Sequence, residues 1–207
     1  MVTFEFLFTV VLVSASGVLG PGPLFLASTL RATKRGTIAG IECAIGHTVV
    51  EFPLVLGLAI GLQAFLQSAA DYIALAGGAV LLVFASMQLF QATKKFEFDP
   101  AKVQGPWAER NGIVIGVAFT ALNPFFILWW GTVGATLTNE ALALGALAGV
   151  MAMFAAHIWM DYAWLGGTAT LVGRGKLVLG KWYRVLLVAF GVAMIYFGTS
   201  FILSSIV

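Results

Sequence analysis

The chain has 207 residues, of which 60% are hydrophobic and 10% are charged, and its mean hydropathy is +1.00. A chain with so few polar residues cannot cover the surface of a soluble globule of this length. The composition therefore indicates an integral membrane protein whose main partner is the lipid bilayer. The net charge of +2 does not suggest a surface for nucleic acid, and the single cysteine, Cys43, excludes a disulfide within the chain.

The basic residues are confined to three short parts of the chain. All 11 lysines and arginines lie in or beside the loops 31–36, 94–110 and 172–184, whereas the connections around Asp71 and Glu140 have none. Because basic loops stay on the cytoplasmic side of a bilayer, these three loops are predicted to be cytoplasmic and both termini extracytoplasmic. The expected location is the plasma (inner) membrane, as a multi-pass protein.

The apolar sequence divides into stretches that can each span a bilayer, since a spanning helix needs about 20 residues. The predicted helices are residues 4–30, 37–66, 71–93, 111–137, 141–171 and 182–206. The polar segment after residue 93, with Asp99-Pro100 and Gly105-Pro106, separates two halves, 1–100 and 101–207. Each half then has three helices, and an odd number inverts the second half relative to the first. The predicted fold is therefore all-α, with six transmembrane helices in two inverted repeats.

The first helix of each half contains a break. Gly20-Pro21-Gly22-Pro23 interrupts one, and Asn123-Pro124 interrupts the other. Proline cannot donate the helical hydrogen bond, which should free acceptors such as the carbonyl of Thr120. A helix that restarts at such a point directs its positive end at an anion. Kinks used only for packing are the alternative. The candidate substrate-binding residues are Pro21, Gly22, Pro23, Asn123 and Pro124.

The two histidines of the chain are each followed four residues later by a carboxylate. These pairs are His47 with Glu51 and His157 with Asp161, in corresponding helices of the two halves. The spacing places each pair on one helix face. A central acidic residue opposes membrane insertion by about 3 kcal/mol, so intramembrane acids usually serve function. The alternative is that each histidine only stiffens the core by bonding its own carboxylate.

Other polar or aromatic residues are expected to have structural roles. Glu42 lies on a different face of its helix from His47 and is predicted to meet a cytoplasmic basic residue. Four tryptophans of the second half could line a cavity, but packing or a position at the membrane interface is the more usual role; these are Trp129, Trp130, Trp159 and Trp164.

The chain resembles the lysine exporter family, the LysE-type translocators of amino acids. The resemblance covers nearly the whole chain and rests on the Pro21-Gly22-Pro23 break, on the segment Phe119 to Pro124, and on glycines in the first half. Those glycines are Gly36, Gly40, Gly46, Gly57, Gly61, Gly77 and Gly78. The resemblance implies six helices, proton-driven export of amino acids or related small solutes, and a homodimer.

Two departures from the family pattern bear on the substrate. Phe125 follows Asn-Pro where family members often have lysine, and His47 follows Gly46 where they commonly have aspartate. The two histidines and two carboxylates would also suit a divalent transition metal such as Zn²⁺, and the wider superfamily includes exporters of heavy-metal cations. A divalent metal exporter is therefore the alternative function, with His47, Glu51, His157 and Asp161 as ligands.

Two inverted repeats with broken helices suggest a carrier in which the halves rock about a central site. In the amino-acid interpretation, the helix starts hold the substrate carboxylate, and Glu51 or Asp161 holds its ammonium group. A proton shared by these acids is the expected coupling ion, and no cofactor is expected. An enzyme is less favoured because the sequence has no nucleophile elbow and no nucleotide-binding motif, and a channel suits broken helices less well than a carrier does.

Overall fold

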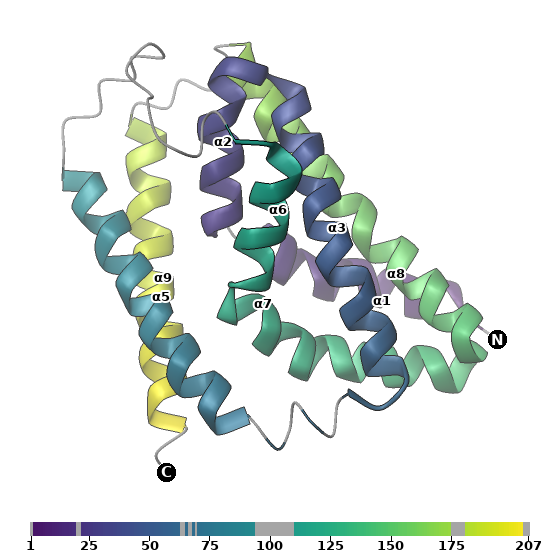
Figure 1. Ribbon diagram of the computed structural model, residues 1–207. Helices are drawn as coiled ribbons and strands as arrows, with labels where there is room; N and C mark the ends of the chain where they lie inside the picture. Colours follow the sequence, from purple (N-terminus) through teal and green to yellow (C-terminus); the bar gives the residue numbers. More distant parts are fainter. Residues whose placement is uncertain are drawn as a thin grey trace.

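The computed structural model describes residues 2–19, 22–62, 65, 68, 70–93, 110–174 and 181–204, and these residues are helical apart from short turns (Figure 1). In chain order the helices are α1 (Phe4–Val18), α2 (Pro23–Arg35), α3 (Thr37–Ala59), α5 (Ala70–Thr93), α6 (Gly112–Ala121), α7 (Pro124–Trp129), the π-helical η1 (Trp130–Gly134), α8 (Ala135–Gly173) and α9 (Lys181–Ser204). Within these residues, two helical runs are long and apolar enough to cross a membrane, Thr37–Ala59 and Phe125–Gly173.

The first helix of each half is divided in two. α1 ends at Val18, and α2 begins at Pro23 with Gly22 as its N-cap; Pro21 lies outside the described residues. α6 ends at Ala121, and α7 begins at Pro124, where the Asn123 side chain accepts a hydrogen bond from the Phe125 N–H at 3.1 Å. Thr120 departs from expectation, because its carbonyl is not free but accepts the Asn123 N–H at 3.1 Å.

Other boundaries differ from the sequence-based ranges. α3 ends at Ala59 and not near residue 66, because Gly61 adopts a positive φ of 109°. The turn expected just before Glu140 is wrong: the helix continues through that residue, which has no helix breaker beside it, and bends at Gly145 and Ala146. The polar segment after residue 93, which is predicted to be a cytoplasmic loop, lies almost wholly outside the described residues.

α3 lies between α6 and α8 and makes its closest contacts through glycine. Gly46 of α3 approaches the backbone of α6 at Gly116 so closely that a Cβ on either would overlap the other helix. Gly40 approaches the backbone of α8 at Leu165 in the same way. Glycine at these contacts lets the backbones of α3, α6 and α8 approach closely, so that side chains from the three helices can meet. α5 and α9 form a pair at one side of the other helices, and α5 also contacts α7 (Figure 1).

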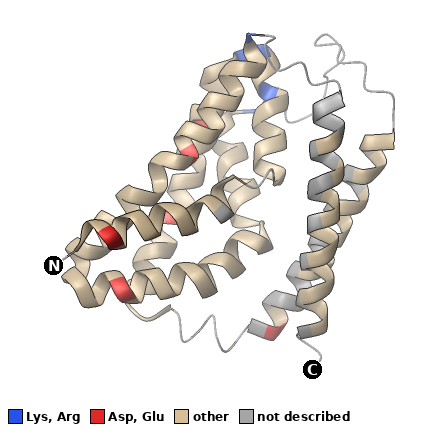
Figure 2. Cartoon of the chain, turned by 180° about the vertical axis from the view of Figure 1, so that it is seen from behind, with Lys and Arg blue, Asp and Glu red and all other residues tan. Residues whose placement is uncertain are grey.

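Charge is distributed unevenly along the molecule. The described lysines and arginines gather at one end, whereas acidic residues occur further along the helices and toward the other end (Figure 2). This separation has the form that the predicted topology requires.

Gly36 and Ala146 adopt nearly the same unusual backbone conformation. Gly36, between α2 and α3, has φ 56° and ψ −140°, and Ala146, at the bend of α8, has φ 49° and ψ −141°. His47 and Glu51 follow Gly36 at the spacing with which His157 and Asp161 follow Ala146. Among the described residues, Ala146 is the one non-glycine residue with positive φ.

We predict that Ala146→Gly raises the stability of the protein by about 1 kcal/mol, because the positive φ is strained for any residue with a Cβ. Ala146 is exposed, so the substitution removes no core contact. The matched variant Gly36→Ala should lower stability. Apparent melting temperatures of the detergent-solubilised variants measure both effects, and a lower value for Ala146→Gly would contradict the prediction.

Candidate functional site

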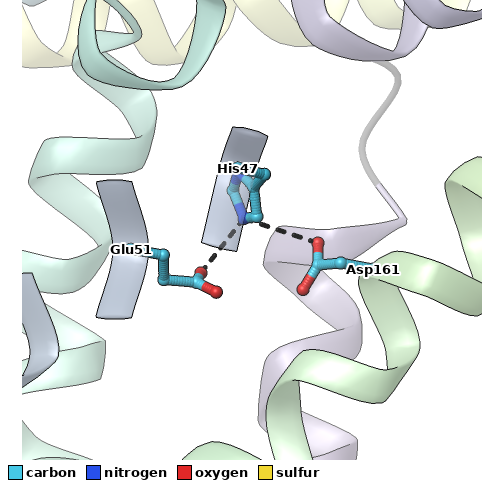
Figure 3. A group of neighbouring side chains, drawn as sticks. All are labelled: His47, Glu51 and Asp161. Carbon is cyan, nitrogen blue, oxygen red and sulfur yellow. Dashed lines mark hydrogen bonds and ion pairs between the residues drawn. The ribbon is translucent and has the colours of Figure 1, made fainter. Parts of the chain in front are cut away.

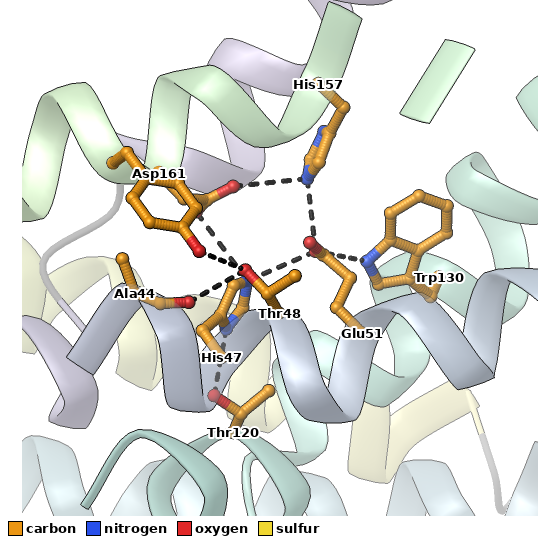
Figure 4. A network of polar contacts seen from close by, with 9 residues as sticks. Ala44, His47, Thr48, Glu51, Thr120, Trp130, His157 and Asp161 are labelled. Carbon is orange, nitrogen blue, oxygen red and sulfur yellow. Dashed lines mark hydrogen bonds and ion pairs between the residues drawn. The ribbon is translucent and has the colours of Figure 1, made fainter. Parts of the chain in front are cut away.

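The four side chains predicted from the sequence meet between two helices. His47 and Glu51 come from α3, and His157 and Asp161 come from α8 (Figures 3 and 4). All four are buried, and Glu51 is 1% exposed. The i, i+4 spacing in each helix therefore directs both pairs toward a common point, and we call these four residues the central quartet.

One carboxylate oxygen of Glu51, Oε1, contacts both histidines of the quartet. His47 Nε2 and His157 Nε2 each lie 3.1 Å from Glu51 Oε1. The indole N–H of Trp130, on η1, donates to the same oxygen at 3.0 Å. Three nitrogens thus lie within hydrogen-bonding distance of a single carboxylate oxygen. This is expected because the oxygens of a carboxylate carry its negative charge.

Asp161 faces the same two imidazoles at a longer distance. Its Oδ1 lies 3.6 Å from His47 Nε2, and its Oδ2 lies 3.5 Å from His157 Nε2. Asp161 Oδ2 and Glu51 Oε2 are buried, and neither has a hydrogen-bond partner within the described part of the chain. His157 Nδ1 is also buried and has no hydrogen-bond partner within the described residues.

Neighbouring residues orient the quartet. His47 Nδ1 lies 2.8 Å from the hydroxyl of Thr120, which α6 supplies, and the ring of Phe126 packs edge-on against His47. The His157 ring contacts both Trp129 and Trp130, with centroids 5.7 and 5.2 Å away. Each imidazole is thus held in one orientation by partners from the second half of the chain.

A cavity of about 80 Å³ adjoins the quartet and is lined by all four of its members. Gly22 and Asn123, from the two helix breaks, line it as well, and a Cβ on Gly22 would lie 3.9 Å from Asn123 Nδ2. The remaining wall is mainly aromatic, formed by Phe25, Phe125, Phe126, Trp129, Trp130 and Trp164. The volume is sufficient for several water molecules or a small solute.

The sequence-based candidates have different positions. Gly22, Asn123 and the quartet line the cavity; Pro23 and Pro124 begin the adjoining helices, and Pro23 is not among the lining residues. Sequence reasoning favoured packing or an interface position for four tryptophans over lining a cavity, but Trp129, Trp130 and Trp164 of that set line the cavity, whereas Trp159 is exposed. It also missed Thr120, whose hydroxyl stands alone among apolar neighbours in α6.

The cavity has polar groups of both kinds. The indole N–H groups of Trp129 and Trp164 are buried and have no hydrogen-bond partner within the described residues, so they are available donors. Glu51 Oε2 and Asp161 Oδ2 are available acceptors. A solute with one acidic and one basic group could be bound by both sets.

A second polar cluster lies at the basic end of the molecule. Arg31 is buried and binds Glu42 Oε2 through Nη2 at 2.7 Å and through Nε at 3.2 Å, and its Nη1 donates to the carbonyl of Arg110. Arg35 binds the other oxygen of Glu42 at 2.9 Å. This is the basic contact predicted for Glu42. It joins α2 and α3 to Arg110, which lies just before the N-cap of α6.

Comparison with known proteins gives a family match. The profile of the LysE type translocator family matches residues 15–205, which is most of the chain. Neither a curated protein nor a solved structure matches the chain significantly.

We predict that Glu42→Gln lowers stability by about 3 kcal/mol, because it removes the carboxylate that pairs with the buried Arg31 guanidinium. Arg35→Gln removes an ion pair on a half-exposed side chain and should cost less than about 1 kcal/mol. Thermal unfolding of both variants in detergent provides the comparison, and equal losses would contradict the prediction.

Proposed function

The chain belongs to the LysE type translocator family, whose members are membrane transporters of small solutes, and we propose that it is a proton-coupled exporter of amino acids or related small solutes. The observation that carries this proposal is the cavity, which brings together both helix breaks and the central quartet. A transport site is expected at such a meeting point of two halves, near the middle of the membrane.

We further propose that the chain is built from two inverted three-helix repeats. The equal conformations of Gly36 and Ala146, and the matching positions of the two histidines and two acids after them, support this proposal. α5 and α9, the last helix of each half, both have 24 residues and pack against each other. Rocking of one repeat against the other would expose the cavity to each side of the membrane in turn.

The solute is held, in this proposal, by two sets of polar groups in the lining of the cavity. The helix starts at Gly22-Pro23 and Asn123-Pro124, with the free indole N–H groups of Trp129 and Trp164, favour a carboxylate. The free oxygens of Glu51 and Asp161 favour an ammonium group. The aromatic wall favours an apolar side chain between them.

Protons are the proposed coupling ion. Two carboxylates and two imidazoles in contact can exchange protons among themselves, and burial makes the net charge of the group costly. Protonation and solute binding at adjoining positions can therefore influence each other. No proton carrier beyond the quartet is required.

The proposed topology keeps the basic end in the cytoplasm and both termini outside a plasma (inner) membrane. The gathering of the described basic residues at one end supports this orientation (Figure 2). A homodimer is proposed from the family alone.

We predict that Glu51→Gln and Asp161→Asn each reduce proton-driven transport to background, because each removes a titratable carboxylate from the quartet. The measurement is accumulation of a panel of radiolabelled amino acids in proteoliposomes with an imposed proton gradient. Glu140→Gln, the same change at an exposed residue, is the control and should retain transport. Full transport by both quartet variants would overturn the proposed site.

A further inference from the structure

Hydrogen bonding alone does not account for the central quartet. Each imidazole Nε2 faces two carboxylates at once, Glu51 at 3.1 Å and Asp161 at 3.5 or 3.6 Å. One N–H donates along one direction, and here both shorter contacts go to Glu51. Asp161 is therefore buried opposite two nitrogens without a hydrogen bond from either.

We propose that the central quartet is a binding site for a divalent transition-metal ion of the Zn²⁺ type, and that the protein carries this ion as a second cargo. The proposal rests on the proposed function in one respect, that the quartet lies in the transport pathway. A cation between the four side chains would satisfy both carboxylates and both imidazoles together.

The spacing of the four groups supports a metal. Tetrahedral Zn²⁺ has ligand bonds of about 2.0–2.1 Å, so its ligand atoms lie about 3.3 Å apart. The nitrogen to oxygen distances within the quartet are 3.1, 3.1, 3.5 and 3.6 Å. The ligand atoms of His47, Glu51 and Asp161 all lie within 4.8 Å of one another. These three residues can therefore supply ligand atoms together, and His157, whose Nε2 lies 3.1 Å from Glu51 Oε1 and 3.5 Å from Asp161 Oδ2, is the fourth candidate.

The types of ligand select the class of ion. Two imidazoles and two carboxylates suit Zn²⁺, Co²⁺ or Ni²⁺, whereas Ca²⁺ and Mg²⁺ prefer shells of oxygen atoms. The surroundings also suit a metal, because ligands are commonly oriented by outer hydrogen bonds. Thr120 can accept the Nδ1–H of His47, and Trp130 donates to Glu51 Oε1.

The binding test is calorimetric titration of the tag-free, detergent-solubilised protein with ZnCl₂. We expect one ion per chain and release of protons into the buffer. Asp161→Asn should weaken binding at least tenfold, and because Asp161 Oδ2 has no hydrogen-bond partner in the described residues, this variant should still fold. Thr120→Val should weaken binding about tenfold by releasing His47. Glu140→Gln is the control and should bind as the parent does.

The cargo test uses proteoliposomes that contain a zinc-sensitive dye and a proton gradient. Zinc movement that is lost in Asp161→Asn and retained in Glu140→Gln would support zinc as a second cargo. Absence of zinc binding, or equal binding by Asp161→Asn, would overturn the inference. Amino-acid transport in the same liposomes tests the proposed function separately, since it can persist when zinc neither binds nor moves.

Discussion

The structure depends on two carboxyl groups that are buried among apolar helices. Glu51 and Asp161 cannot be left unpaired there, so α3 and α8 must pack with their histidine faces together. Close packing of α3 against α8 is possible because Gly40 leaves no side chain between the two backbones, and Gly46 does the same between α3 and α6. The cost of burying polar groups and the small size of glycine thus act on the same helix, and together they determine where the cavity forms.

Much of this arrangement could be predicted from the sequence because it follows from periodicity and charge. The i, i+4 pairs define a helix face, proline defines a helix start, and uncharged stretches of about 20 residues define candidate spans. α5 agrees with its predicted range to within a residue, since a uniform apolar stretch between Asp71 and the first lysines of the linker leaves little choice.

The remaining features depend on tertiary contacts that one sequence does not encode locally. The bend of α8 has Gly145 as its one local signal, and the positive φ of Ala146 has none, because alanine favours a helix. Thr120 and Trp130 became part of the site only because α6 and η1 lie beside α3 and α8. A tryptophan in an apolar helix is equally consistent with lipid contact, as Trp159 illustrates, and with a cavity wall.

The short joints at Gly36 and Ala146 restrict how the two halves can move. Only Gly36 separates α2 from α3, so the helix start at Gly22 cannot shift far without moving His47 and Glu51 with it. Asn123 is similarly connected to His157 and Asp161 through the bend of α8, with no flexible loop between them. In the proposed carrier, the groups of each half that face the solute and those that bind the ion would therefore move together as one rigid, bent unit. The backbone itself would then couple the two proposed ligands, without a chain of side-chain rearrangements.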